Sequence, residues 1–356
     1  MDPTKIDRRS LLQLMAGGAL AAGGAAPAAA QATTELVVVA TGGAFEKALR
    51  EHFYDPFAKE TGIRIRPVSA TNSETWTKLR AMQQTGRVEW DIVTAWPEDL
   101  VAQSAMLEPV ECGALKNLAA HGVEGACLPN GVLRTLGAVT ISYDKTKFPN
   151  GAPKTWADFW DVKRFPGPRA MPNAGAPWWP LMAALQADGV DKDKLFPLDL
   201  DRAFKKLDEI RPHVTVWWRT GDQSQQMFRS GEVVLAQMWS GRALALKDAG
   251  MPIEVAWTGA PPNTALWAIV KGTKNKEAAM RFLDYFVTRP EAHLPFSNAV
   301  NFDTVNRTAL TKLTPEQRLD RVTDPANAKQ MAAMDAAWVA ENRTALLERW
   351  NRWLAS

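Results

Sequence analysis

Two short polar segments in the middle of the chain carry side chains that could hold a small charged ligand. The first runs from Trp218 through Arg219 to Asp222, and the second begins with Trp239 and Ser240. An arginine offers a planar fork that suits a carboxylate. An aspartate can pair with one ammonium group, and an indole face attracts a cation. These residue types predict a site for a zwitterion or a monoamine. The alternative is a buried Trp pair with charges at the surface.

Both segments stand directly after stretches that we expect to be strands. Val214–Trp218 is rich in β-branched and aromatic residues, and residues 233–239 form a second apolar run. A polar, helix-like stretch and a Ser-Gly turn separate the two runs. In open α/β sheets, ligands bind in the crevice beyond the carboxyl ends of the strands. We therefore expect the two polar segments to line one crevice.

The amino-terminal part of the chain alternates between strand and helix patterns. Strands are predicted at residues 35–40, 63–68 and 90–94, with helices between them. The first helix carries four apolar residues spaced by four, which places them on one core-facing stripe; they are Phe45, Leu49, Phe53 and Phe57. This βαβαβ rhythm is typical of a parallel sheet covered by helices.

The first predicted strand ends at Thr41, Gly42 and Gly43, immediately before a helix. Glycines in such a turn let the backbone approach a ligand closely, with the helix N–H groups directed at it. The spacing matches neither the dinucleotide fingerprint nor the phosphate-binding loop. We therefore expect these residues to contact a ligand that is not a nucleotide.

The chain contains no recognisable catalytic motif. A Gly-x-Ser-x-Gly elbow, a His-Glu-x-x-His pair and a Cys/His pair in a catalytic context are all missing. The four histidines are scattered and predict no metal cluster. We expect a binding protein without catalytic residues, metal or cofactor. An enzyme built on the same scaffold is the alternative, because a fold does not determine a function.

The first 30 residues have the composition of an export signal. Lys5, Arg8 and Arg9 form a basic region, an apolar segment of Leu, Ala and Gly follows, and small residues near position 30 supply a cleavage site. The segment is too short and too weakly apolar to span a membrane. The Arg pair resembles the twin-arginine signal, but Asp7 and Gln13 depart from it, so the general secretory route stays open. We expect a soluble periplasmic protein.

Charge and cysteine content narrow the function further. Removing residues 1–30 takes three of 42 basic and two of 39 acidic residues, which leaves a net charge of +2. This balance and the lack of a Lys/Arg-rich run argue against nucleic-acid binding. The two cysteines, Cys112 and Cys127, predict one disulfide in an oxidising compartment. Two free thiols are the alternative.

Seven segments occur in a recognisable order, namely FYDPFAKETGIRI (53–65), SETWTKLRAM (73–82), WDIVTAWPEDL (90–100), LGAVTISYDKTKF (136–148), KTWADFWDVKRFPG (154–167), SGEVVLAQMWSGRALALKDAGMPIEVAW (230–257) and WAIVKGTKNKEAAMRFLDYFV (267–287). In order and spacing they resemble the periplasmic solute-binding proteins of bacterial ABC importers, and specifically the spermidine/putrescine-binding branch of family 1. The resemblance covers nearly the whole mature chain.

The resemblance implies an α/β fold of the type II periplasmic-binding-protein class, with two lobes joined by crossover strands and a ligand cleft between them. We expect residues 31–136 and 263–310 in the first lobe. Residues 137–262 and 311–356, with the C-terminal helices, should form the second. The chain is expected to be a monomer whose partners are a small-molecule ligand and an inner-membrane ABC permease.

The family's cleft segments, together with the residue types above, give the predicted ligand-binding set, namely Thr41, Gly42, Gly43, Trp96, Asn173, Trp178, Trp218, Arg219, Asp222, Trp239 and Asn263. Polyamine binders place carboxylates near positions 173–179 and 263–265, and this chain has none there. A buried ammonium without a carboxylate partner is penalised by several kcal/mol. We therefore expect an amine or amino-acid-like, zwitterionic ligand.

Three alternatives remain open at this point. The first is a polyamine ligand, and the second is a sensor that hands the ligand to a membrane receptor instead of a permease. In the third, Arg219 and Asp222 only pair with each other at the surface.

Overall fold

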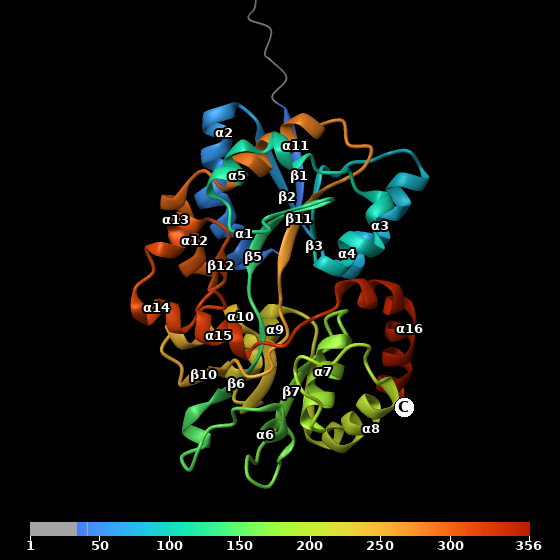
Figure 1. Cartoon of the computed structure of the whole chain (residues 1–356), viewed down its shortest axis with the longest axis vertical. Coiled ribbons are helices and arrows are strands. Elements are labelled where there is room, and N and C mark those ends of the chain that lie inside the picture. Colours follow the sequence, from blue (N-terminus) through green and yellow to red (C-terminus); the bar gives the residue numbers. More distant parts are fainter. Residues whose placement is uncertain (1–33, 41) are drawn as a thin grey trace, which may run out of the picture. The chain divides into compact units, whose positions relative to one another are not determined.

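The computed structural model describes residues 34–40 and 42–356. The export signal predicted at residues 1–30 and the predicted ligand contact at Thr41 lie outside the described residues. Within the described part, two β-sheets are each covered by helices (Figure 1). We call each sheet with its helices a lobe. The first lobe contains the strands nearest the amino terminus.

The sheet of the first lobe is mixed. Its strand order is β12-β5-β11-β3-β1-β2, with β4 paired to β5. β1 pairs in parallel with both β2 and β3, as the βαβαβ rhythm predicts. β11, a strand from much later in the chain, runs antiparallel between β3 and β5, so the complete sheet is mixed. The strands are β1 (Glu35–Ala40), β2 (Arg64–Ser69), β3 (Ile92–Ala95), β4 (Cys127–Leu128), β5 (Gly131–Leu136), β11 (Ala265–Ile269) and β12 (Asp303–Thr304).

The sheet of the second lobe has the order β10-β6-β9-β7-β8, and β7 runs parallel to β8 and β9. β9 begins two residues later than predicted. The N–H groups of Glu232 and Val233 donate to the carbonyl of Met227 and so belong to the preceding turn. The strands are β6 (Val139–Asp144), β7 (Arg169–Pro172), β8 (Val214–Trp218), β9 (Leu235–Trp239) and β10 (Ile253–Ala256).

The chain passes from one sheet to the other at two neighbouring places. Gly137 lies between β5 and β6, and Asn263 lies between β10 and β11. The Asn263 N–H donates to the Gly137 carbonyl over 2.9 Å, so the two crossings run side by side. A Cβ atom at Gly137 would lie 2.5 Å from the ring of Phe302. Glycine is therefore required for this close packing at the crossing.

The first helical segment shows how an unusual residue spacing is accommodated. It consists of α1 (Gly43–Leu49), a π-helical turn η1 (Arg50–Tyr54) and α2 (Asp55–Thr61), and all four residues of the predicted stripe are buried. A repeat of exactly four residues is longer than the 3.6 residues of an α-helical turn. The wider π-helical turn compensates for this difference and keeps the stripe on the core side.

The remaining elements of the first lobe are helices and short turns. α3 begins after Thr71, whose hydroxyl and the Glu74 carboxylate form a capping box. These elements are α3 (Asn72–Gln84), α4 (Pro97–Ala102), η2 (Ser104–Met106), η3 (Cys112–Ala114), α5 (Lys116–His121), α11 (Lys276–Phe286), α12 (Pro290–Val300) and α13 (Arg307–Thr311).

The second sheet and the carboxyl-terminal tail carry the other helices. The tail after α13 forms three separate helices, α14, α15 and α16. The set is η4 (Lys145–Lys147), α6 (Trp156–Trp160), α7 (Trp178–Ala187), α8 (Leu200–Ile210), η5 (Arg211–His213), α9 (Gly221–Arg229), α10 (Ser240–Asp248), α14 (Pro315–Leu319), α15 (Pro325–Gln330) and α16 (Ala336–Ala355).

The long terminal helix α16 contacts both lobes (Figure 1). Its apolar side chains Val339, Leu346 and Trp350 are buried in the core of the second lobe. On the same face of the helix, one turn after Val339, Arg343 donates to the carboxylate of Asp99 in α4 of the first lobe. The helix therefore ties the lobes together in addition to the crossings at Gly137 and Asn263.

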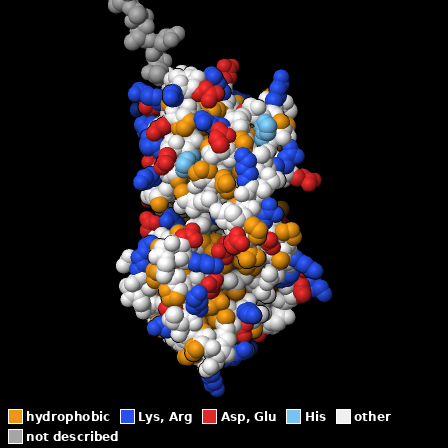
Figure 2. All heavy atoms as spheres, turned by 90° about the vertical axis from the view of Figure 1, so that its left-hand side faces the viewer, with side chains coloured by type: hydrophobic (Ala, Val, Ile, Leu, Met, Phe, Trp, Pro, Cys, Tyr) orange, Lys and Arg blue, Asp and Glu red, His pale blue; other side chains and the backbone are white. Residues whose placement is uncertain are grey.

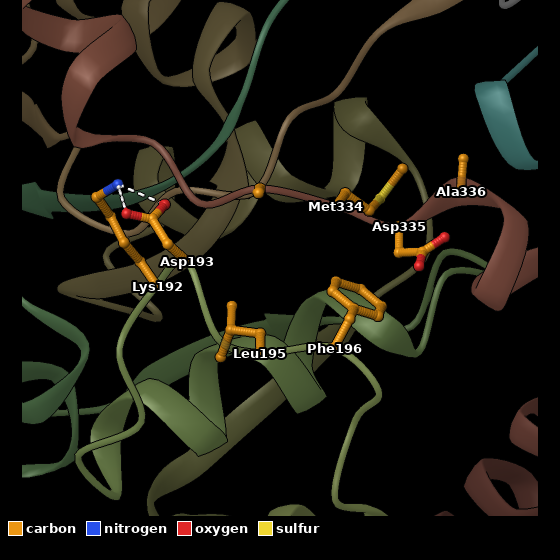
Figure 3. A pocket seen from close by; sticks show the side chains of 8 residues that line it. Lys192, Asp193, Leu195, Phe196, Met334, Asp335 and Ala336 are labelled. Carbon is orange, nitrogen blue, oxygen red and sulfur yellow. Dashed lines mark hydrogen bonds and ion pairs between the residues drawn. The ribbon is translucent and has the colours of Figure 1, made fainter.

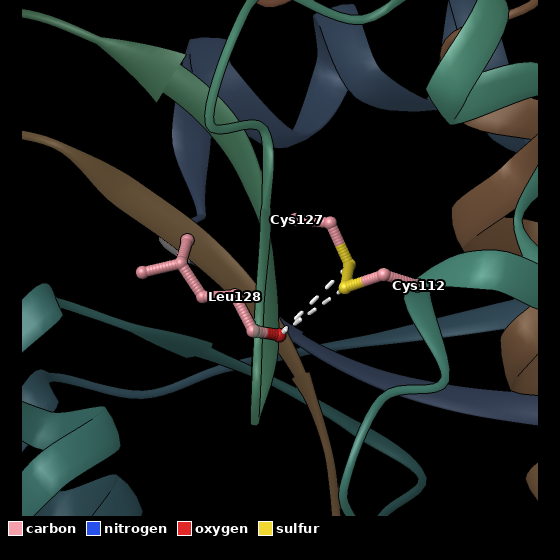
Figure 4. Close-up of a disulfide and its surroundings, with 3 residues drawn as sticks. All are labelled: Cys112, Cys127 and Leu128. Atoms are coloured by element: carbon pink, nitrogen blue, oxygen red, sulfur yellow. Dashed lines mark hydrogen bonds between the residues drawn. A yellow bond between two sulfur atoms is a disulfide. The ribbon is translucent and has the colours of Figure 1, made fainter.

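Cys112 and Cys127 form the predicted disulfide, which lies beside the β4–β5 hairpin (Figure 4). The bridge closes a loop with a sequence separation of 15 residues. In the chain-entropy model, closing such a loop stabilises the folded protein by roughly 3 kcal/mol.

Replacing both cysteines by serine should lower the free energy of unfolding by about 3 kcal/mol, because the unfolded chain regains the entropy of the open loop. Urea unfolding of the C112S/C127S variant tests this value. Dithiothreitol should not change the free energy of unfolding of the variant, whereas it should lower that of the original protein by reducing the disulfide. An equal urea midpoint for the oxidised protein and the variant would contradict the prediction.

The described residues also bear on the membrane and on surface charge. No helix in residues 34–40 and 42–356 combines the length and the apolar character needed to cross a bilayer. Acidic and basic side chains are interspersed on the face shown in Figure 2. That pattern agrees with the near-neutral balance of the sequence.

Candidate functional site

A cavity of about 560 Å³ lies between the two lobes. Loops at the carboxyl ends of β1, β2, β3, β8 and β9 contribute to it, as expected for ligand sites of α/β sheets. Its wall consists of Gly42, Gly43, Ala44, Phe45, Ser69, Ala70, Thr71, Asn72, Glu74, Thr75, Thr94, Trp96, Arg134, Thr135, Ala174, Arg219, Thr220, Gly221, Asp222, Gln225, Arg229, Trp239, Gly241, Arg242, Ala245, Asn263, Ala265, Ala299, Val300 and Phe302.

Seven residues of the predicted set lie in this wall. The first lobe and the crossing strand contribute Gly42, Gly43, Trp96 and Asn263, and the second lobe contributes Arg219, Asp222 and Trp239. Gly43 has a left-handed backbone with φ of 69°, which favours glycine at this position. The structure thus brings together residues that are up to 221 positions apart in the chain, from Gly42 to Asn263.

Three predicted residues do not line the cavity. Trp178 and Trp218 are fully buried in the core of the second lobe, and the Trp218 indole N–H donates to the Gln237 carbonyl. Asn173 accepts a hydrogen bond from the indole of Trp350 through its side-chain oxygen. Large apolar rings at strand and helix ends gain more from core burial than from exposure in a cleft. The sequence pattern did not distinguish a tryptophan that is buried in the core from one that lines the cavity.

The two tryptophans of the cavity, Trp96 and Trp239, each pack against a buried tryptophan. Trp239 packs edge-on against Trp218, with ring centroids 5.1 Å apart. Trp96, from the loop after β3, packs edge-on against Trp179 of α7 at 5.3 Å. Both cavity tryptophans are partly buried, so each offers one surface to a ligand while its other side is fixed by the core.

Asp222 pairs with Arg242, and not with Arg219 as one alternative held. The Arg242 Nη1 donates to the Asp222 carboxylate over 2.9 Å. The carboxylate also approaches Gly43 of the opposite lobe, where a Cβ atom would lie 3.6 Å from Asp222 Oδ2. Burial lowers the pKa of the Arg242 guanidinium, and the neighbouring Asp222 opposes that shift. Asp222 therefore already has a cationic partner, which weakens its attraction for the ammonium group of a ligand.

Arg219 reaches the cavity from an exposed position. Its backbone N–H donates to the side chain of Gln223, which closes the turn before α9. Among the described residues, its guanidinium has no ion-pair partner within 4 Å. Arg229 at the end of α9 is likewise exposed and lines the same wall.

Arg134 of β5 is a cavity residue that the sequence analysis missed. It is only 4% exposed, and its Nη1 donates to the Thr94 hydroxyl over 2.6 Å. Burial lowers the pKa of its guanidinium to about 10, so it stays protonated at neutral pH. One signal was visible in the sequence. A single arginine interrupts an otherwise uncharged strand just before the crossing at Gly137.

The cavity wall carries more positive than negative charge. Its four arginines are Arg134, Arg219, Arg229 and Arg242, and its two carboxylates are Glu74 and Asp222. Hydrogen bonds from Thr71 lower the pKa of the Glu74 carboxyl, and the group is committed to the capping box of α3. Guanidinium groups in this excess favour a ligand that carries at least one carboxylate.

A second, smaller hollow of about 370 Å³ lies in the second lobe between the loop at residues 192–196 and residues 333–336 (Figure 3). Its charged residues are Lys192, Asp193 and Asp335, and the first two pair with each other. Asp335 caps α16. These charges already have partners, so we place the ligand in the larger cavity. In the described part of the chain, no group of three or more His, Cys, Asp or Glu side chains is arranged to hold a metal.

Comparison with known proteins shows which proteins this chain is similar to. The model of the family described as bacterial extracellular solute-binding protein matches residues 52–330. The γ-aminobutyric acid-binding protein of Pseudomonas aeruginosa is 32% identical over 90% of this chain and 91% of its own length. The spermidine/putrescine-binding periplasmic protein of Salmonella typhimurium is 25% identical over 75% of this chain and 77% of its own.

A solved structure supports the architecture. The crystal structure of an ABC transporter substrate-binding protein from Bradyrhizobium japonicum is 34% identical and superposes with a TM-score of 0.81, covering 90% of this chain and 99% of that one. The two-lobe α/β architecture predicted from the sequence is thus confirmed.

Proposed function

Since this chain belongs to the family of bacterial extracellular solute-binding proteins, we propose that its interlobe cavity captures a small zwitterionic, amino-acid-like solute. The protein is the substrate-binding component of an ABC transporter. In our proposal the loaded protein delivers the solute to an inner-membrane permease. It acts as a monomer and performs no catalytic step.

The guanidinium excess of the cavity carries this proposal. Four arginines face two carboxylates, and both carboxylates already have partners. A polyamine brings two or more ammonium groups, each of which needs an acceptor when it leaves water. A zwitterion satisfies a guanidinium with its carboxylate, and its single ammonium can lie against the tryptophan faces. The relative named for γ-aminobutyric acid, which is more similar than the polyamine-binding one, supports the same choice.

We further propose a division into lobes for the closing motion. Residues 31–136 and 263–310 form the first lobe, and residues 137–262 and 311–356 form the second. Sheet membership supports this division, because every strand in these ranges belongs to the corresponding sheet. The core packing of α16 supports its place in the second lobe. Closure about the paired crossings at Gly137 and Asn263 would exclude water from the cavity.

The amino terminus and the compartment complete the proposal. The composition of residues 1–30 supports a cleaved export signal, and the family is extracellular. The disulfide also fits an oxidising compartment. We therefore place the mature protein in the periplasm as a soluble binder.

Calorimetric titration with γ-aminobutyrate, putrescine and spermidine tests the ligand class. We expect micromolar or tighter binding of γ-aminobutyrate, and binding of both polyamines that is at least 100-fold weaker, because the cavity offers their ammonium groups no free carboxylate. Native mass spectrometry of the protein as purified should show a co-bound small acid or zwitterion. Micromolar putrescine binding would contradict the proposal.

A further inference from the structure

One arginine of the cavity differs from the other three in its burial. Arg134 is 4% exposed, whereas Arg219 and Arg229 are exposed and Arg242 is paired with Asp222. Charge interactions are stronger where water is excluded. A ligand anion would therefore gain more from Arg134 than from an exposed guanidinium at the rim.

The guanidinium of Arg134 is held in a fixed orientation. It lies 4.6 Å from the ring centroid of Phe45 and 4.7 Å from that of Trp267. Its Nη1 donates to the Thr94 hydroxyl, and this hydroxyl in turn donates to the Val39 carbonyl over 3.0 Å. A planar donor fixed in this way loses little entropy when a carboxylate binds to it.

The protein supplies no counter-ion for this buried cation. No carboxylate in residues 34–40 and 42–356 lies within 4 Å of the guanidinium, and its Nε is buried without a hydrogen-bond acceptor. The titratable group whose charge would act on Arg134 is the hydroxyl of Tyr54, and burial raises the pKa of that hydroxyl, so it is neutral. A buried, uncompensated charge is costly in the unliganded protein.

We propose that Arg134, with Thr94 beside it, binds the carboxylate of the ligand and so places that end of the molecule on the first lobe. This inference rests on the proposed function and adds an orientation to it. The carboxylate accepts hydrogen bonds from the guanidinium, and the ammonium end extends toward the tryptophan faces of the cavity. The ligand then docks first on the lobe that holds Arg134, and the second lobe closes over it.

The decisive variant is Arg134→Met, which keeps the length and the apolar contacts of the side chain but removes the charge. The affinity for γ-aminobutyrate should fall by about 100-fold or more, because a buried charge pair loses one member. The unliganded variant should melt at the same temperature as the original protein or higher, because a buried unpaired charge is gone. Arg134→Lys retains the charge without the fork and should bind with intermediate affinity.

A matched ligand pair separates the carboxylate from the rest of the molecule. In the original protein, 4-aminobutanamide should bind about 100-fold more weakly than γ-aminobutyrate, and Arg134→Met should abolish that difference. Arg281→Met, which removes an exposed arginine on α11 away from the cavity, is the control and should bind γ-aminobutyrate normally. An unchanged preference for the carboxylate in Arg134→Met would overturn the assignment.

A spectroscopic titration tests the anchor independently of the natural ligand. Butyrate, a carboxylate without an amine, should produce a saturable shift of the Arg134 side-chain N–H resonance at millimolar concentration, and butylamine should not. A shift at Arg219 or Arg242 instead, or no saturable shift at all, would overturn the assignment. Failure of γ-aminobutyrate to bind while butyrate still titrates Arg134 would refute the zwitterionic ligand class and leave the anchor supported.

Discussion

Replacing Arg343 by methionine should lower the free energy of unfolding by about 3 kcal/mol or more, because removing one member of a buried ion pair leaves the other uncompensated. The partner is Asp99, which is completely buried and lies 2.5 Å from Arg343 Nη1. Asp99 also accepts hydrogen bonds from the Asn72 side chain and from the Trp96 backbone N–H. Those two donors cannot replace the lost positive charge.

Urea unfolding at neutral pH without ligand measures this loss. Arg352→Met, on the same helix at an exposed position, is the matched control and should change stability by less than about 0.5 kcal/mol. The double variant of Arg343→Met with Asp99→Asn should be less destabilised than the sum of the two single variants. Additive effects would mean that the pair contributes no coupling and would refute the prediction.

The same pair links α16 of the second lobe to α4 of the first. Trp96, which lines the cavity, stands one residue before α4. Weakening the pair should therefore disturb the cavity wall as well as the fold. No sequence motif indicated this link, because Arg343 and Asp99 are 244 positions apart.

Local patterns predicted most of the elements but not their pairing. Strands β1 and β8 occupy the expected residues, because each combines a clear apolar pattern with a turn at its end. The insertion of β11 between β3 and β5 joins segments more than 100 positions apart. Long-range pairing of this kind depends on the whole core and leaves no local pattern.

The candidate site was predictable where residue chemistry and strand ends coincided. Arg219, Asp222 and Trp239 follow strands and do reach the cavity. Trp218 follows the same logic, but strand alternation directs it into the core on one face of the sheet, while Trp217 packs against Trp350 and Trp353 on the other face. Arg134 was missed because its importance lies in what surrounds it. Only the structure shows that no carboxylate accompanies it among the described residues.

Replacing Glu98 by glutamine should change how stability depends on pH. Glu98 lies in the first turn of α4 and is 1% exposed, and its Oε2 has no hydrogen-bond partner. Burial, together with the neighbouring Asp99 carboxylate, raises the pKa of Glu98 to about 8. The folded protein therefore holds this side chain neutral at pH 7, whereas in the unfolded chain it is ionised.

Proton linkage gives the sign of the change in stability with pH. Between the ordinary pKa of a glutamate and about 8, the folded state binds one more proton than the unfolded state, so stability falls as the pH rises. Below the ordinary pKa of a glutamate, Glu98 is protonated in both states, and its effect on stability no longer changes with pH. Glutamine mimics the neutral acid at every pH, so Glu98→Gln should match the original protein at pH 5. At pH 8 it should be more stable by roughly 3–4 kcal/mol.

Urea unfolding of both proteins at several values between pH 5 and pH 8 tests the prediction. The difference between the two isolates Glu98 from other titrating groups, such as the buried His293, whose pKa burial lowers to about 4. Glu89→Gln, at an exposed position of the same lobe, is the matched control for the substitution itself. A constant difference between Glu98→Gln and the original protein across the range would mean that Glu98 is ionised in the folded state. An ionised Glu98 would then need a cationic partner. Arg343, which already pairs with Asp99, is the cation whose charge lowers the pKa of Glu98.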